Sequence, residues 1–249
     1  MDCGKILKSI NNGDIIIQLY NPASDLDEVL SVHREAYMKY ANTFILFDLN
    51  KPENENALRE YEQMVFVLLK AGISLVARHR TSNKIIGYCI NMIHSRQEPG
   101  KPNFYEAFRN KAHFPLIRQL LNFRIDKDKQ IDLFNMYGID HYFEMVYTAT
   151  LPEFRMHKIA TDLMVCAIQL AKELAAGKYP SIIDPSLIGK RPRIVFGSGS
   201  SKYAIKIVDK LGFTPVKIFP LNQLKANGVL VSQKIPSEHT KSTLQVLKL

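Results

Sequence analysis

The chain has 249 residues, 46% of them hydrophobic and 23% charged, the composition of a globular protein with ample material for a core. No stretch approaches the roughly 18 uninterrupted apolar residues of a membrane span, and the charged start of the chain does not resemble a signal peptide. The net charge of +9 would suit nucleic acid, an anionic membrane or a polyanionic small molecule. No long basic run, zinc spacing or aromatic-rich basic patch is present, so neither nucleic acid nor a membrane is expected as a partner.

Three cysteines, Cys3, Cys89 and Cys166, are widely spaced along the chain. Their odd number and their spacing fit neither a disulfide framework nor a metal site. We therefore expect a protein of a reducing compartment, by default the cytoplasm, that holds no metal.

The first half of the sequence predicts a strand, two helices and a hairpin. Residues 14–20 are rich in isoleucine and end at Asn21-Pro22, which is typical of a strand and its turn. Ser24 fits an N-cap for a helix whose apolar residues recur at helical spacing up to residue 40, and a second helix is expected over residues 55–70. Residues 73–79 and 84–93 flank a polar turn and predict a hairpin.

The second half predicts strands and helices in alternation. After a long mixed segment, residues 144–150 read as a buried strand that Leu151-Pro152 stops, and a helix follows to about residue 176, with Gly177 as its C-cap. Residues 193–196 predict a strand, a short helix ends at Gly212, and residues 216–219 and 229–235 predict a closing pair of strands. The order indicates one α/β domain, residues 1–249, built around a single mixed sheet.

The segment most informative about function is the turn between the strand ending at Thr150 and its following helix. Such a turn leaves main-chain N–H groups unpaired at a helix N-terminus, where the helix dipole also favours an anion. Arg155 and Lys158 add positive charge at the same place. Strand-to-helix turns occur in every α/β protein, however, and Arg155 also fits a solvated surface residue.

Residues 151–160, Leu-Pro-Glu-Phe-Arg-Met-His-Lys-Ile-Ala, resemble the acetyl-CoA loop of the GNAT superfamily, Arg/Gln-x-x-Gly-x-Gly/Ala. Arg155 and Ala160 match its first and last positions, whereas Lys158 stands where that pattern has its first glycine. Residues 200–213, which close in Leu-Gly-Phe, are similar to the superfamily's second CoA-contacting helix. The two elements come in the order that the superfamily has, with a helix and a strand between them.

The resemblance narrows to the insect arylalkylamine N-acetyltransferases, of which this chain looks like a divergent member. Residues 130–137 resemble the Asp-Leu-Phe…Tyr segment of that family, and residues 235–249 resemble its closing Pro-His-Thr segment. The hairpin segment 85–91 also fits. These matches are spread over almost the whole chain from residue 14 onward.

The resemblance implies a GNAT-type α/β fold, a mixed and mostly antiparallel sheet flanked by helices, with strands splayed at the acetyl-CoA site. It also implies the residues that bind the cofactor: Thr148, Ala149 and Thr150 along the pantetheine arm, Arg155, Met156, His157, Lys158, Ile159, Ala160 and Thr161 at the diphosphate, and Ser201 and Lys206 on the second helix. Lysines 202, 206 and 210 share one helix face. This face could meet the 3′-phosphate, or it is a solvated charged surface.

The chemistry requires that a substrate ammonium, with a pKa of about 10, lose a proton to a carboxylate or a water chain before it attacks the thioester. The family's base is a glutamate in an Asp-Glu-Pro-Leu-Asn motif after the first helix, and this sequence lacks that motif. Glu35 and Asp48 are acids of the same region, and each also fits a surface or capping role. His239 matches the histidine of the closing segment and could relay a proton or be structural.

For the substrate, an arylalkylamine would need an apolar slot, which Tyr37, Tyr40, Phe47 and Tyr142 could line, although each also fits a core position. The altered base region favours a shifted substrate such as an aliphatic amine or polyamine, while the positive net charge disfavours a polycation. Two further hypotheses remain. The chain is a CoA-binding protein with altered or lost catalysis, or a basic interaction protein. We expect a monomer or a weak dimer.

Overall fold

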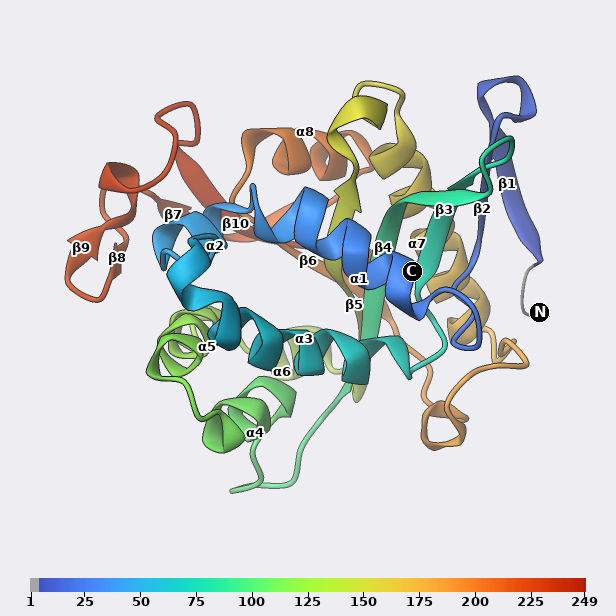
Figure 1. Cartoon of the computed structure of the whole chain (residues 1–249). Coiled ribbons are helices and arrows are strands. Elements are labelled where there is room, and N and C mark those ends of the chain that lie inside the picture. Colours follow the sequence, from blue (N-terminus) through green and yellow to red (C-terminus); the bar gives the residue numbers. More distant parts are fainter. Residues whose placement is uncertain (1–4) are drawn as a thin grey trace.

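The computed structural model describes residues 5–249, so Cys3 lies outside the described residues. Among these residues, eight strands form one sheet in the order β1-β2-β3-β4-β5-β6-β10-β7, and β8 and β9 form a separate hairpin (Figure 1). The strands are β1 (Ile6–Ile10), β2 (Ile15–Leu19), β3 (Leu75–His79), β4 (Lys84–Ser95), β5 (His141–Thr150), β6 (Ile194–Gly199), β7 (Thr214–Pro220), β8 (Lys225–Ala226), β9 (Val229–Leu230) and β10 (Lys241–Lys248).

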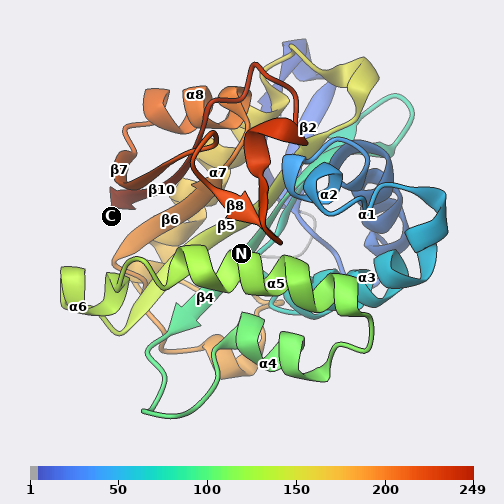
Figure 2. The same ribbon diagram turned by 90° about the vertical axis from the view of Figure 1, so that its left-hand side faces the viewer.

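Helices cover both faces of the sheet. They are α1 (Leu26–Val32), which continues into a π-helical segment (His33–Met38), α2 (Asn42–Leu46), α3 (Glu55–Leu69), α4 (Phe104–Lys111), α5 (Pro115–Asp128), α6 (Leu133–Tyr137), α7 (Ile159–Ala175) and α8 (Lys202–Lys210). In Figure 1, α1 and α3 lie in front of β4 and β5, and α7 lies behind them. Figure 2 shows α5 crossing the same face as α3, below the sheet strands β5 and β6.

Side-chain alternation along the central strands divides the core into two layers. Tyr88 and Ile90 of β4 join the layer under α1, α3 and α5, whereas Cys89 between them joins the layer under α7. Both described cysteines, Cys89 and Cys166, are buried and unpaired. The central strands β3, β4 and β5 are therefore covered on both faces, whereas the edge strands β1 and β7 are largely exposed.

The antiparallel alternation of the sheet is interrupted once. All neighbouring pairs are antiparallel except β5 and β6, which run parallel. Their pairing covers only Phe143↔Val195 to Met145↔Gly197, although β5 continues to Thr150. The mixed, mostly antiparallel sheet with splayed strands expected from the sequence is confirmed.

Most predicted elements are present with shifted ends. The strand over 229–235 was wrong: only Val229–Leu230 is extended, a 3-10 turn (Val231–Gln233) follows, and β7 pairs instead with β10. The strand β10 was missed although its apolar side chains, Leu244 and Val246, alternate with polar ones. No helix within residues 5–249 is both long and apolar enough to cross a membrane.

The long mixed segment between the hairpin and β5 contains three helices that the sequence analysis did not predict. A capping box begins α4, in which Asn103 accepts from the N–H of Glu106 and Glu106 accepts from that of Asn103. Pro115 is in the first turn of α5, and Asp132 caps α6. These are ordinary helix-start signals, so the sequence carried the information.

Candidate active site

Beyond Met145, strands β5 and β6 separate, and we call the opening between them the splay. The end of β5 presents unpaired main-chain groups to this opening. The N–H of Leu151 donates to the carbonyl oxygen of Ile86 on β4 at 2.9 Å, and Gly87 lies opposite Thr150. Since successive N–H groups of a strand point to opposite sides, those of Thr150 and Thr148 point away from β4, toward β6. The pairing with β6 has already ended at Met145, so these groups face a gap in the ladder.

The loop that follows β5 turns the chain into α7 through two left-handed residues. Met156 has φ 68° and Lys158 has φ 62°, a region that side chains other than glycine rarely adopt. The ring of His157 donates from Nδ1 to the carbonyl oxygen of Arg155 at 2.9 Å, which ties the loop together. Within the described chain, the N–H groups of residues 156–161 meet no hydrogen-bond acceptor.

The lysine that replaces glycine does not obstruct the loop. Lys158 takes the left-handed conformation that a glycine would supply without strain, and its side chain is exposed to solvent. Met156 is 96% exposed, while Ile159 is buried under α7 and fixes the helix start. The unpaired N–H groups and the positive end of the α7 dipole therefore remain available to an anion.

Three contacts tie the segment between α1 and α2 to the splay. The ring of Tyr37 lies 4.9 Å from that of Tyr147 on β5. The Cζ atom of Arg155 lies over the Tyr40 ring, 4.6 Å from its centre. Asn42 donates from Nδ2 to the carbonyl oxygen of Ser200, just beyond β6, at 2.8 Å. Residues 37–42 thus reach all three elements that border the splay, and we call them the strap.

The second predicted cofactor element begins at α8. Ser201 caps the helix by accepting from the N–H of Tyr203 at 3.3 Å. Lys206 lines a shallow hollow of about 210 Å³ between α8 and the start of β10, together with Lys202, Ile205, Asp209, Thr240 and Lys241. Ile207, on another face of the helix, packs with the α7 layer. Contact between Lys206 and a cofactor stays a prediction.

Of the three candidate bases, Asp48 and His239 are engaged in other contacts, and Glu35 is an exposed side chain two residues before the strap. The carboxylate of Asp48 contacts Lys51 at 3.1 Å and Lys234 at 3.2 Å, and hydrogen bonds from these lysines lower its pKa. Glu35 is exposed on the π-helical segment. His239 is 9% exposed, and its Nδ1 accepts from the N–H of Lys202 at 3.2 Å, while burial lowers its pKa.

The four aromatic residues expected to line a slot lie in different places. Tyr37 stacks on His33, Tyr40 is 44% exposed beside Arg155, and Phe47 is buried against Phe123. Tyr142 lies opposite His94 near the start of β5, at the end of the strand away from the loop. The structure therefore does not gather them into one wall, and a substrate role for each stays a prediction.

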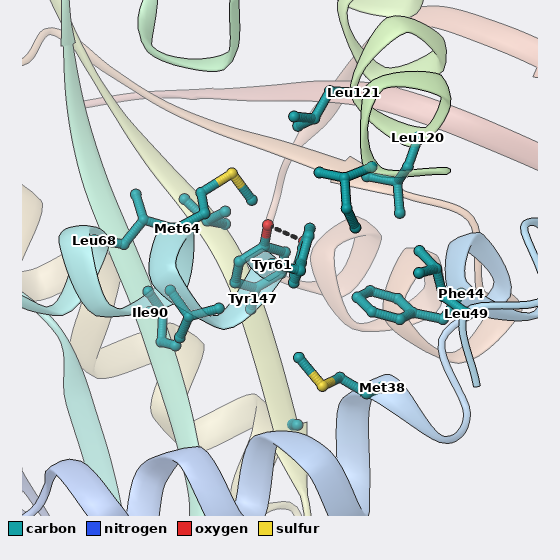
Figure 3. Close-up of a cluster of buried hydrophobic side chains, with 14 of the residues drawn as sticks. Met38, Phe44, Leu49, Tyr61, Met64, Leu68, Ile90, Leu120, Leu121 and Tyr147 are labelled. Carbon is teal, nitrogen blue, oxygen red and sulfur yellow. Dashed lines mark hydrogen bonds between the residues drawn. The ribbon is translucent and has the colours of Figure 1, made fainter. Parts of the chain in front are cut away.

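A buried cluster of tyrosines around His33 was not anticipated from the sequence. His33 is fully buried, and its Nδ1 is hydrogen-bonded to the Tyr88 hydroxyl at 2.6 Å. Burial lowers its pKa to about 3, so the ring is neutral at physiological pH. The hydroxyls of Tyr61 and Tyr147 bond to each other among the surrounding apolar side chains (Figure 3). The helical spacing of His33 with Tyr37 was a signal, but it was assigned only to a helix face.

A buried charged cluster lies farther along β5. Glu144 is fully buried, accepts from Tyr105 at 3.0 Å, and contacts His94 and Arg124. Burial opposes ionisation of this carboxyl group, but Arg124 and His94 lower its pKa to about 2. The sequence predicted a buried strand from residue 144 onward but gave Glu144 no role. Nothing in the sequence pattern indicated that His94, Tyr105 and Arg124 would contact it.

No family model matches the sequence, and no curated protein is significantly similar to it. Solved structures do match. Arylalkylamine N-acetyltransferase 2 of Aedes aegypti is 17% identical with a TM-score of 0.76, covering 94% of this chain and 99% of that one. The mosquito arylalkylamine N-acetyltransferase-like protein 5b is 17% identical with a TM-score of 0.75, covering 94% and 100%. The Drosophila melanogaster polyamine N-acetyltransferase, which forms N-acetylagmatine, is 16% identical with a TM-score of 0.70, covering 95% and 100%. At these identities the likeness shows the fold, and the fold is that of the GNAT N-acetyltransferases.

Proposed function

We propose that this protein is an acetyl-CoA-dependent N-acetyltransferase that acts on the amino group of a small amine. The observation that carries the proposal is the presence of two neighbouring sets of unpaired main-chain donors, Thr148 and Thr150 on β5 and residues 156–161 in the loop. An extended amide chain can add to an open strand edge, and a diphosphate suits a helix N-terminus. Both requirements are those of one molecule, coenzyme A.

The residues of the chain divide the work of the reaction. Bound acetyl-CoA would supply the thioester, whose acetyl group passes to the amine. The N–H of Thr150 faces the splay and can donate to the thioester oxygen as negative charge develops there. Arg155 and the N–H groups of residues 156–161 hold the diphosphate, and the exposed Lys158 adds charge nearby. These residues together would hold the coenzyme at the splay, and the thiol of coenzyme A would leave as the acetyl group passes to the amine.

The amine must lose its proton before it attacks. Asp48 is paired with two lysines, and the Nδ1 lone pair of His239 is already used by Lys202. We therefore propose that the proton leaves through water on the exposed side of the strap. With no protein base, the enzyme uses only the unprotonated fraction of the amine. The value of kcat/KM for total amine should therefore rise about tenfold for each pH unit toward the amine pKa of roughly 10.

The substrate class proposed is a primary amine, aryl-alkyl or aliphatic. The matched structures are described as acting on arylalkylamines and on a polyamine, agmatine. Thiol release from acetyl-CoA, measured over aryl, alkyl and polyamine substrates from pH 7 to 10, tests the proposal. The absence of thiol release with every amine from pH 7 to 10 would reject the proposal.

A second candidate is a CoA-binding protein with altered or lost catalysis. It is favoured by the engagement of Asp48 and His239 in other contacts, which leaves neither of them ready to accept a proton. Calorimetry with CoA separates the two. Binding with turnover supports the enzyme, binding without turnover supports the second candidate, and no binding rejects both.

A further inference from the structure

The only aromatic ring that the described residues place over Arg155 belongs to Tyr40, in the strap. The distance from Cζ to the ring centre is 4.6 Å, well within the range of a cation–π contact. Tyr40 is 44% exposed and lies between α1 and α2, whereas Arg155 belongs to the loop before α7. The contact therefore joins the two sides of the splay.

Arg155 has no carboxylate partner within residues 5–249, although thirteen pairs of a lysine or arginine with a carboxylate are formed elsewhere among these residues. Its guanidinium is held by the ring instead. Stacking uses the flat face of a guanidinium and leaves its N–H groups, which lie in the plane, free to donate. The other cation near this ring, Lys39, is farther away at 5.8 Å.

A diphosphate needs those in-plane donors. A flexible arginine on an exposed loop would lose side-chain entropy when it bound. The loop itself is already ordered by Ile159 and by the hydrogen bond from His157. The Tyr40 ring orders the remaining part, the side chain of Arg155.

We propose that Tyr40 is a positioning residue for the coenzyme, which holds the Arg155 guanidinium at the diphosphate site through its ring. The inference rests on the proposed function, because it assumes that coenzyme A binds at this loop. It assigns Tyr40 to the cofactor side of the splay and not to the amine slot. It also implies that coenzyme A binding depends on both the strap and the loop between β5 and α7.

The test is a double-mutant cycle with calorimetry of CoA binding. Arg155→Ala should weaken CoA by about tenfold or more, as the loss of a charge-assisted hydrogen bond. Tyr40→Leu should weaken CoA by about two- to fivefold, the range for an exposed cation–π contact, while Tyr40→Phe keeps the ring and should restore wild-type affinity. In the Arg155→Ala background, Tyr40→Leu should have no further effect.

Two controls separate positioning from a structural role. Phe66→Leu removes the ring under Lys70, at 4.2 Å on α3, and should leave CoA affinity unchanged. Pantetheine lacks the diphosphate, so its binding should not respond to Tyr40→Leu. In a turnover assay, Tyr40→Leu should raise KM for acetyl-CoA and leave kcat in place.

The outcomes are distinct. Equal losses from Tyr40→Leu with and without Arg155, or tighter CoA binding by Tyr40→Leu, would overturn the inference and leave the proposed function standing. Failure of the wild-type chain to bind CoA at all would overturn both.

Discussion

The loop after β5 and the segment between α1 and α3 border the same splay, but they are built from different groups. The loop offers main-chain N–H groups from residues 156–161, and it keeps its shape although Lys158 takes the place of glycine. The other segment can act only through side chains, and its acid Asp48 is neutralised by Lys51 and Lys234. A main-chain site tolerates substitution as long as φ and ψ are kept, whereas a side-chain site is lost with one residue or one new partner.

The largest effect is expected where side-chain charge is most deeply buried. Changing Glu144→Gln removes the more deeply buried of the two carboxylates that pair with Arg124 and leaves only Asp128, and we expect a loss of about 3 kcal/mol in the free energy of unfolding. Urea unfolding measures it. The matched control is Glu55→Gln, which removes a fully exposed pair with Arg59 and should leave the midpoint unchanged. Equal urea midpoints for the two variants would show that the buried Glu144 cluster contributes no more to stability than the exposed Glu55–Arg59 pair.

The same carboxylate predicts a pH dependence. Its pKa is about 2 in the folded chain and roughly 4.3 when unfolded, so the unfolded state binds more protons between these values. The contribution of Glu144 to stability is complete above about pH 4.3 and is lost as the pH falls toward 2. In Glu144→Gln, the fall of the unfolding free energy between about pH 4.3 and pH 2 should be smaller by this contribution. The main-chain N–H groups of the loop after β5 do not titrate in this range.

The second effect tests the main-chain side directly. Proline at position 158 cannot take φ 62° and has no N–H, so Lys158→Pro should weaken CoA by roughly a hundredfold. Lys158→Gly accepts the same φ and loses only an exposed positive charge, so it should weaken CoA far less than the proline variant does, with a slightly higher melting temperature. Calorimetry and thermal melting measure both. Tight binding by the proline variant would show that this loop is not the diphosphate site.

A smaller effect is expected at His239, whose ring accepts from the first N–H of α8. His239→Ala should lower the free energy of unfolding by about 1 kcal/mol, as the loss of a helix cap does. The rise of kcat/KM with pH should keep its slope. A flattened pH profile would instead make His239 the base that the sequence suggested.

The smallest effect is expected at Asp48. Because its carboxylate already serves two lysines at the surface, Asp48→Asn should change kcat by less than about twofold and stability by less than about 1 kcal/mol. Steady-state kinetics at saturating amine checks this. A fall of about 10²-fold or more, the size of general-base catalysis, would restore Asp48 as the base.

Much of the architecture could be predicted from local signals. The hairpin of β3 and β4, the buried strand β5 and the helix α7 follow from apolar periodicity and from the breakers at Pro152 and Gly177. The loop after β5 could be placed because it lies between these two elements, and its role as the coenzyme site, which a resemblance within a dozen consecutive residues suggested, stays a prediction. The strand β10 and the helices α4 to α6 were missed although caps and alternation marked them.

The sequence by itself determined which groups the chain carries at the end of β5 and that Lys158 stands in the loop. Only the tertiary structure decided that β5 and β6 part after Met145, that Tyr40 lies over Arg155, and that Asp48 and His239 are engaged by lysines far away in the sequence. The physical reason is the separation along the chain over which each kind of signal acts. Periodicity and capping are encoded within a few residues, whereas a pairing partner or the neutralisation of a charge depends on which distant segments the fold brings together.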